Sequence, residues 1–256
     1  MSFRTRNEEK TYKISNVSYS SRIRFLAVAR NDIRFKVILS FLTIVLLSAC
    51  GNKTQSTDSE QSAAKTDSAA TSNKKTILFF GDSLTAGYGL DDPSEAFPGV
   101  IQRKIDSAKL PYTVVNAGVS GETTAGGLGR IDWALKQKVD IFILELGAND
   151  GLRGIPAAET AQNLQAIADK VKAKYPEAKL VLLGMQVPPS MGGDYANSFK
   201  AVFPKVAADK KMALVPFLLD GIGGNPKLNQ ADGIHPTAEG AKIAAENVWK
   251  VLKGQL

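Results

Sequence analysis

The sequence predicts an α/β protein built on a parallel β-sheet with helices on both faces. Short apolar runs alternate along the chain with longer segments in which apolar residues recur every three or four positions. The first pattern is typical of buried strands and the second of amphipathic helices. Strands separated by helices of ten to fifteen residues form parallel pairs through right-handed crossovers, so helices cover both faces of the sheet. The chain has 256 residues, 44% of them hydrophobic, which is enough for one large core.

Five strands and five helices are expected from residue 76 onward. The strands are expected at 76–80, 112–116, 140–146, 179–184 and 213–216. The helices are expected at 95–109, 124–137, 157–174, 194–208 and 237–252. This order predicts a flavodoxin-like, three-layer α/β/α sandwich with a five-stranded parallel sheet. We therefore expect one folded domain at 76–256, preceded by segments at 1–49 and 50–75.

The positive charge of the chain belongs mostly to its first fifty residues. The formal net charge is +7, and residues 1–50 carry nine Lys/Arg against three acidic residues, which accounts for +6 of it. The rest of the chain is nearly neutral. Because the positive charge belongs mainly to these first residues, it does not indicate a nucleic-acid partner, and we expect none.

Residues 1–49 are expected to be a basic leader that ends in a lipoprotein signal peptide. Arg34 and Lys36 precede an apolar run at 37–47, which is too short to span a membrane comfortably. The run ends in Leu-Ser-Ala-Cys at 47–50, which resembles the bacterial lipobox, where the cysteine is lipid-modified. Cys50 is the only cysteine of the chain, so neither a disulfide framework nor thiol catalysis is expected. The alternative, a buried core cysteine, has no strand-like sequence around it.

A lipidated Cys50 would anchor the protein to a membrane of the bacterial cell envelope. Residues 50–75 are rich in Ser, Thr and Ala and contain no large apolar side chain, so we expect a flexible tether. Gly51 and Asn52 follow the cysteine without an aspartate, which under enteric-type sorting indicates the outer membrane, facing the periplasm.

The first chemical motif is Gly-Asp-Ser-Leu-Thr at 81–85, directly after the first strand. Ligands of α/β proteins bind at this edge of the sheet, so Ser83 is a candidate nucleophile whose own N–H could face an oxyanion. The ordinary alternative is a serine that caps the next helix. Thr85 stands where a nucleophile elbow has its second glycine, which argues against the α/β-hydrolase fold.

A base for Ser83 could come only from His235, the single histidine of the chain. Asp232 precedes it by three residues across a turn with Gly233, so its carboxylate can reach the imidazole Nδ1–H and fix the tautomer. A purely structural histidine is the alternative. The Asp-x-x-His spacing before a helix start favours the catalytic interpretation.

Two further motifs follow the second and third strands. Gly121 lies in the loop at 116–124 and could offer a free backbone N–H. Asn149 lies in the segment 146–154 and could offer a neutral amide donor. Each could also be an ordinary turn residue. Together with Ser83 they are candidates for an oxyanion hole.

The ordered motifs with Ser83, Gly121, Asn149 and Asp232-x-x-His235 closely resemble the SGNH hydrolases, also called GDSL esterases. The resemblance covers about residues 75–254 and is greatest to the bacterial thioesterase I/lysophospholipase L1/arylesterase branch. It implies the SGNH hydrolase fold, with Ser83 as nucleophile, His235 as base and Asp232 as its partner. It also implies an oxyanion hole of the Ser83 N–H, the Gly121 N–H and the Asn149 side chain. It implies no cofactor and no metal.

The resemblance implies a small-molecule ester or lipid-like substrate, hydrolysed through an acyl-enzyme by a monomer. We expect carboxylic esters with aryl or acyl groups, together with acyl thioesters and lysophospholipids. An apolar groove for the substrate could be formed by Leu152, Ile155, Pro188 and Pro189. Alternatively, these residues pack under their own loops. Two other functions remain open: an acetyl-sugar esterase of the same fold, and a lipid-binding lipoprotein without catalysis.

Overall fold

The structure, a computed structural model, describes residues 74–256, except for the side chain of Pro189. The predicted leader, the lipidation site at Cys50 and the tether up to residue 73 lie outside these residues. Between residues 74 and 256, no helix has the length and apolar character needed to cross a membrane.

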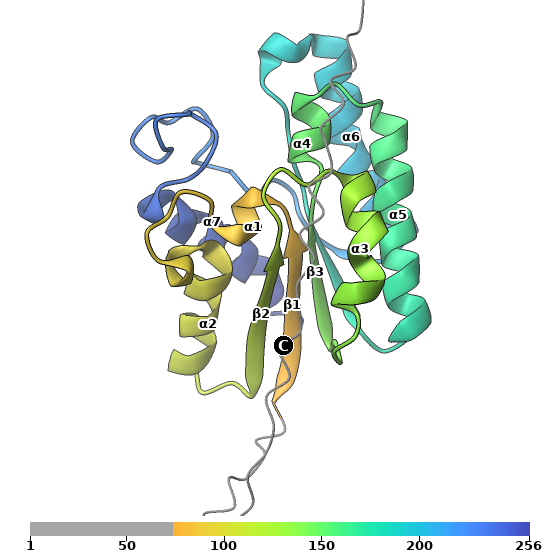
Figure 1. Cartoon of the computed structure of the whole chain (residues 1–256), viewed down its shortest axis with the longest axis vertical. Coiled ribbons are helices and arrows are strands. Elements are labelled where there is room, and N and C mark those ends of the chain that lie inside the picture. Colours follow the sequence, from red (N-terminus) through yellow and green to blue (C-terminus); the bar gives the residue numbers. More distant parts are fainter. Residues whose placement is uncertain (1–73) are drawn as a thin grey trace, which may run out of the picture. The chain divides into compact units, whose positions relative to one another are not determined.

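All strands of the sheet run parallel, as predicted (Figure 1). The strands are β1 (Lys75–Gly81), β2 (Tyr112–Gly118), β3 (Ile141–Glu145), β4 (Lys179–Leu183) and β5 (Ala213–Val215). They lie in the order β2-β1-β3-β4-β5. The expected five-stranded parallel sheet is therefore confirmed, with β1 and β3 in its interior.

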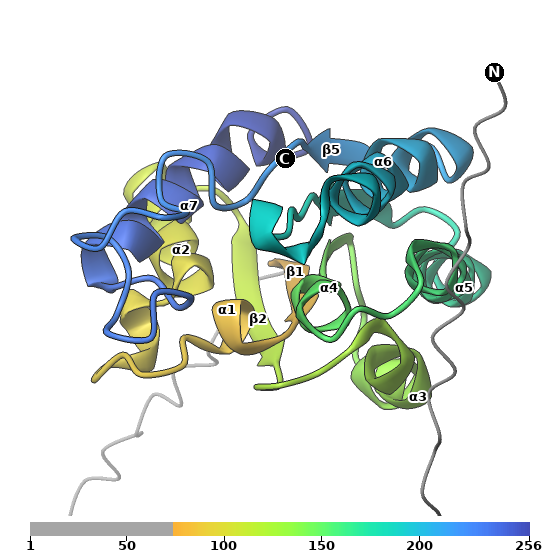
Figure 2. The same ribbon diagram turned by 90° about the horizontal axis from the view of Figure 1, so that it is seen from above.

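Helices cover both faces of the sheet, which makes the three layers of a sandwich (Figure 2). On one face lie α2 (Phe97–Ser107) and α7 (Ala238–Leu252), which pack on each other. On the other lie α3 (Thr124–Ala134), α5 (Ala157–Lys174) and α6 (Gly193–Asp209), with α5 between its two neighbours. Because both faces are covered, the central strands are apolar on both sides and β3 is buried throughout.

The helix and strand bounds differ from the expected ones by at most three residues, as helix ends commonly do. Four one-turn elements were not expected: α1 (Ser83–Ala86), α4 (Ala148–Leu152), and the 3₁₀ helices η1 (Pro93–Glu95) and η2 (Pro189–Met191). Instead of one helix at 95–109, the structure has η1 followed by α2, and the positions of two prolines explain the break. Pro93 starts η1, and α2 begins only at Phe97, with Pro98 in its first turn, where its missing N–H costs nothing.

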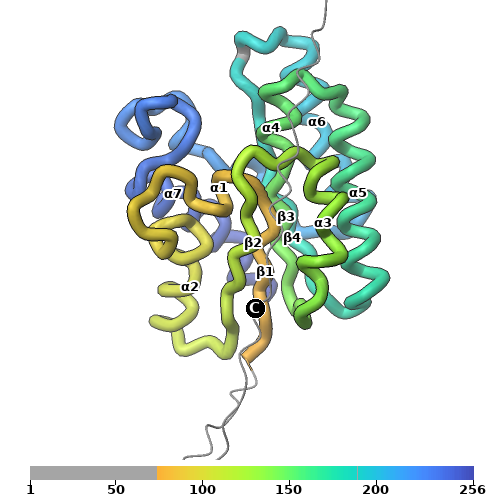
Figure 3. The backbone as a smooth tube through the Cα atoms, viewed as in Figure 1, coloured from red at the N-terminus to blue at the C-terminus, as the bar shows by residue number. Residues whose placement is uncertain are grey.

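The strand order places a crevice at the carboxyl end of β1. From β1 the chain passes to β2 on one side, and from β2 it crosses to β3 on the other side of β1. Ligands of open α/β sheets bind where the connections diverge in this way. Figure 3 shows the carboxyl ends of β1, β2 and β3 converging there, beneath α1 and α4.

Candidate active site

Ser83 is the first residue of α1, at the end of β1. Asp82 caps this short helix, since its Oδ1 accepts the N–H of Leu84 at 3.0 Å. The end of β2 packs directly against the turn, and a Cβ at Gly118 would come within 2.3 Å of the Ala86 nitrogen. Gly118 thus allows the end of β2 to pack closely against α1, and this packing holds Ser83 in place.

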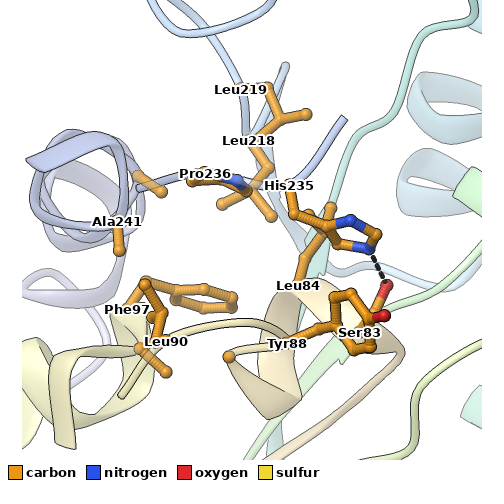
Figure 4. A pocket seen from close by; sticks show the side chains of 13 residues that line it. Ser83, Leu84, Tyr88, Leu90, Phe97, Leu218, Leu219, His235, Pro236 and Ala241 are labelled. Atoms are coloured by element: carbon orange, nitrogen blue, oxygen red, sulfur yellow. Dashed lines mark hydrogen bonds between the residues drawn. The ribbon is translucent and has the colours of Figure 1, made fainter. Parts of the chain in front are cut away.

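His235 lies between Ser83 and Asp232, as the sequence predicts. Figure 4 shows its contact with Ser83. Its Nε2 is 3.0 Å from Ser83 Oγ, across 152 residues of chain, and its Nδ1 is 2.6 Å from Asp232 Oδ2. The other oxygen of Asp232 accepts the N–H groups of Ile234 and His235 at 2.8 and 3.0 Å. The hydrogen bond from the His235 side chain, aided by these two, lowers the pKa of Asp232 to about 2. An ionised carboxylate at this place favours the tautomer in which Nε2 accepts the serine proton.

Gln230 joins the histidine turn to the serine turn, a role that the sequence analysis missed. Its side-chain Nε2 donates to the carbonyl oxygens of Tyr88 at 2.7 Å and Pro236 at 3.0 Å. Its backbone N–H donates to the His235 carbonyl at 2.7 Å. The Tyr88 ring lies 4.7 Å from the imidazole, centroid to centroid. These contacts fix the position of His235 relative to α1.

The predicted oxyanion donors gather on the other side of Ser83. Between residues 74 and 256, the backbone N–H groups of Ser83 and Gly121 have no hydrogen-bond acceptor, so both could bind an oxyanion. Gly121 has φ +77°, and its carbonyl accepts from Arg153 Nη2 at 3.0 Å. Asn149 Nδ2 donates to Asp82 Oδ2 at 3.2 Å and to the Glu122 carbonyl at 3.1 Å. An oxyanion would have to share the Asn149 donor or displace one of these acceptors.

A second buried carboxyl, Glu145, lies beneath the serine turn. Glu145 ends β3, in register with Gly81, and its Oε2 accepts the Asp82 N–H at 3.1 Å and the Thr85 hydroxyl at 2.8 Å. Burial raises the pKa of Asp82 to about 6. Burial and the neighbouring Asp82 charge raise the pKa of Glu145 well above its usual range. We infer that Glu145 keeps its proton, because its ionised form would lie buried beside the Asp82 carboxylate. Within residues 74–256, its Oε1 has no hydrogen-bond partner.

Arg130 ties the loop that carries Gly121 to the ends of two strands. It is ion-paired with Glu122 and donates to the Ala117 carbonyl at 2.9 Å. Its guanidinium stacks on the Phe80 ring at 3.9 Å. The role of Arg130 could not be predicted from the sequence, because its partners are brought together only by the fold.

Leu152, Ile155 and Pro188 are not among the residues that line the crevice drawn in Figure 4. Leu152 and Pro188 are exposed and Ile155 is half-buried, and their contact with substrate remains a prediction, as does that of Pro189. The crevice beside Ser83 and His235 offers about 10 Å³, roughly the space of one water molecule. Its apolar lining includes Leu84, Leu90, Phe97, Leu218, Leu219 and Pro236.

No group of three or more potential metal ligands among His, Cys, Asp and Glu is found within residues 74–256. The model of the GDSL-like lipase/acylhydrolase family matches residues 79–243, which include Ser83, Gly121, Asn149 and both residues of the Asp-x-x-His motif. The chain belongs to this family.

Curated relatives in the family are named as esterases. The chain is 44% identical over 180 residues to Esterase TesA of Pseudomonas aeruginosa, covering 70% of this chain and 88% of the relative. It is 36% identical to an arylesterase of Vibrio mimicus, covering 72% and 92%. It is 37% identical to thioesterase 1/protease 1/lysophospholipase L1 of Escherichia coli K12, covering 70% and 83%.

The solved structures agree with the fold. The crystal structure of TesA matches with a TM-score of 0.68 at 44% identity, over 71% of this chain and the whole of that chain. The family member described here therefore has the SGNH hydrolase fold of the TesA-like branch, and it is a carboxylic ester hydrolase.

Proposed function

We propose that Ser83, His235 and Asp232 form the catalytic triad of this esterase. The observation that carries the proposal is the unbroken chain of contacts from Ser83 Oγ through both imidazole nitrogens to Asp232, at 3.0 and 2.6 Å. Both distances are within hydrogen-bond range, and the carboxylate fixes the imidazole by two further backbone bonds. No other histidine in the sequence could serve as base.

In the proposed reaction, His235 Nε2 takes the proton of Ser83 as Oγ attacks the ester carbonyl. The oxyanion binds the N–H groups of Ser83 and Gly121 together with Asn149 Nδ2. The imidazolium then protonates the leaving oxygen, and the alcohol departs to leave an acyl-enzyme. Water, deprotonated by the same nitrogen, attacks that ester and releases the acid and Ser83. The neutral Asn149 amide stabilises the oxyanion without adding a charge to the site.

The proposed substrates are carboxylic esters with aryl or short-to-medium acyl groups. Support comes from the relative named an arylesterase, and the relative named as thioesterase and lysophospholipase supports acyl thioesters and lysophospholipids as further substrates. An acetyl-sugar esterase remains the second candidate chemistry. We expect hydrolysis of p-nitrophenyl esters over a series of acyl lengths, and little activity on acetylated oligosaccharides.

The decisive experiment compares Ser83→Ala with the wild-type chain and with Ser107→Ala on this ester series. Ser107 is exposed at the end of α2, and its hydroxyl bonds only its own helix, so its variant controls for the loss of a serine. We expect Ser83→Ala to be inactive and Ser107→Ala to match the wild type. Residual turnover by Ser83→Ala at the wild-type rate, or an inert wild type, would contradict the proposal.

We also propose that the protein is a lipoprotein of the bacterial outer membrane, with its domain in the periplasm. The apolar run at 37–47 and the lipobox-like sequence ending in Cys50 support this location. Labelling with radioactive palmitate should mark the wild-type chain and not Cys50→Ser, which should also leave the membrane fraction. A Cys50→Ser chain that keeps the label would contradict lipidation and leave the esterase assignment untouched.

A further inference from the structure

Charge is unevenly distributed between the two edges of the sheet. The carboxyl edge, where Ser83 lies, carries most of the acidic side chains of the domain, including the exposed Asp91, Asp92 and Asp232. The opposite edge, where strands begin and helices end, is rich in lysine. We call it the amino edge, and its exposed lysines are Lys74, Lys75, Lys109, Lys136, Lys138, Lys172, Lys174, Lys179, Lys211 and Lys253.

Six of these lysines surround two adjoining depressions at the base of the sheet. One depression has a volume of about 360 Å³ and includes Lys75, Lys138, Lys174 and Lys179 in its wall. The other, of about 410 Å³, shares Lys179 and adds Lys172 and Lys211. The segment 176–179 and Gln255 line both, so the depressions form one continuous surface.

The positive charge of this surface is largely unneutralised. Among residues 74–256, only Lys138 of the six pairs with a carboxylate, that of Asp140 at 3.2 Å. Lys172 instead donates to the carbonyl oxygens of Pro176 and Ala178, and Lys179 to that of Gln255. Carbonyl partners at helix and strand ends hold the ammonium groups in place without cancelling their charge. The two acidic side chains of the surface, Asp140 and Glu177, leave a clear positive excess.

The chain also joins the domain at this edge. Residues 1–73 connect to β1 through Lys74 and Lys75, at the end of the strand farthest from Ser83. A membrane anchor in the preceding residues would therefore be attached to the domain at its amino edge. Clusters of lysine beside a membrane anchor bind anionic lipid headgroups through Coulomb attraction, which acts within about a Debye length of the surface.

We propose that the amino edge docks on an anionic phospholipid surface and that the active site then points away from that membrane. β1 spans seven residues at about 3.3 Å each, so the carboxyl edge lies roughly 20 Å above the docked surface. Substrates then reach Ser83 from the aqueous side, and esters within the anchoring bilayer itself stay out of reach. The acidic carboxyl edge adds to this orientation, because anionic lipids repel it.

Vesicle binding by the domain from Lys74 to Leu256 tests the docking without any anchor. This fragment is suitable because it corresponds to the whole of the solved TesA chain, and hydrolysis of a p-nitrophenyl ester verifies that it is folded. We expect it to co-sediment with vesicles of phosphatidylcholine and phosphatidylglycerol at low salt, and not with phosphatidylcholine alone. Added salt should release it. Absence of binding to the anionic vesicles would overturn the proposal.

Charge-reversal variants test whether vesicle binding depends on the amino edge or only on the net charge of the protein. Lys174→Glu, Lys179→Glu and Lys211→Glu combined should weaken binding at least tenfold with unchanged ester hydrolysis. The matched control reverses three exposed lysines outside the amino edge, Lys200, Lys227 and Lys242, and should bind nearly as well as the wild type. If the two triple variants lost vesicle binding equally, binding would not depend on the amino edge, and the proposal would be refuted. If the reversed protein does not fold, glutamine at the same three positions should still weaken binding.

The orientation has its own measurement. The fragment contains no cysteine, because Cys50 is the only one of the chain, so single labels can be placed at will. A fluorophore on Glu177→Cys, at the amino edge, should be quenched by brominated lipids on binding. The same fluorophore on Asp91→Cys, in the loop after α1, should not. Stronger quenching at position 91 would overturn the orientation, and esterase activity in both variants keeps this result distinct from any failure of the proposed catalysis.

Discussion

Replacing Glu145 by glutamine should make the protein more stable, and increasingly so as the pH rises. Glu145 is completely buried at the end of β3. Its Oε2 accepts from the Asp82 N–H and the Thr85 hydroxyl. Glutamine has nearly the same shape. Its carbonyl can keep both acceptor bonds, and its NH₂ takes the place of the Oε1 side of the carboxyl. The substitution therefore removes one titration and leaves the buried bonds in place.

The magnitude follows from the raised pKa of Glu145. Burial and the Asp82 charge keep its carboxyl protonated in the folded state, whereas the unfolded chain ionises near the usual value of 4.5. Folding then takes up a proton, so the contribution of Glu145 is fully present below pH 4.5 and declines as the pH rises. The loss is about 1.4 kcal/mol per pH unit above pH 4.5 until Glu145 itself ionises. Glutamine has no such loss.

Urea unfolding followed by circular dichroism over a series of pH values measures the effect. The difference in free energy of unfolding between Glu145→Gln and wild type should widen by about 1.4 kcal/mol per pH unit above pH 4.5. Glu177→Gln, on an exposed side chain, controls for the loss of one glutamate. A difference between Glu145→Gln and wild type that stays constant with pH would mean that Glu145 is ionised in the folded protein, and would refute the reasoning.

Three further substitutions test the site on p-nitrophenyl esters. Asp232→Asn should lower kcat about 10³- to 10⁴-fold, because the amide no longer favours the required tautomer of His235; a loss under tenfold would contradict that role. Asn149→Ala should lower kcat about 10²- to 10³-fold with KM nearly unchanged, since one oxyanion donor is lost; a rise in KM alone would count against it. Gln230→Ala should lower kcat roughly tenfold by loosening His235 against Tyr88, and a circular dichroism spectrum equal to that of wild type should accompany the loss.

The strands could be predicted because the layers of the sandwich bury them on both sides. The expected strand at 76–80 is one residue shorter at each end than the observed β1, and the one at 179–184 is one residue longer than β4. The long helix α5 was predicted with its observed bounds, since its buried residues repeat at helical spacing from Thr160 to Val171. The helices α1 and α4 have four and five residues, too few to show a 3.6-residue period, and only the fold of the strand ends reveals them.

The site was predictable where the chemistry leaves few choices. With one histidine in the chain, the base had a single candidate, and Asp232 lies within reach of it in sequence. Glu145 was missed although a signal was present, since it is the one glutamate inside the otherwise apolar run at 141–146. Its function depends on the register of β3 against β1, which pairs Gly81 with Glu145 and which no local pattern specifies.

The geometry of the proposed site depends in part on tertiary contacts outside the sheet. Ser83, Gly121 and Asn149 follow β1, β2 and β3, which are neighbours in the sheet and held by its backbone hydrogen bonds. His235 comes instead from the loop between β5 and α7, and the Gln230 side chain joins that loop to the serine turn across 142 residues. A loop with few such bonds can open while the sheet stays intact. The distance between Ser83 and His235 is therefore the part of the site least determined by the sheet, and Gln230 is the residue that compensates for this.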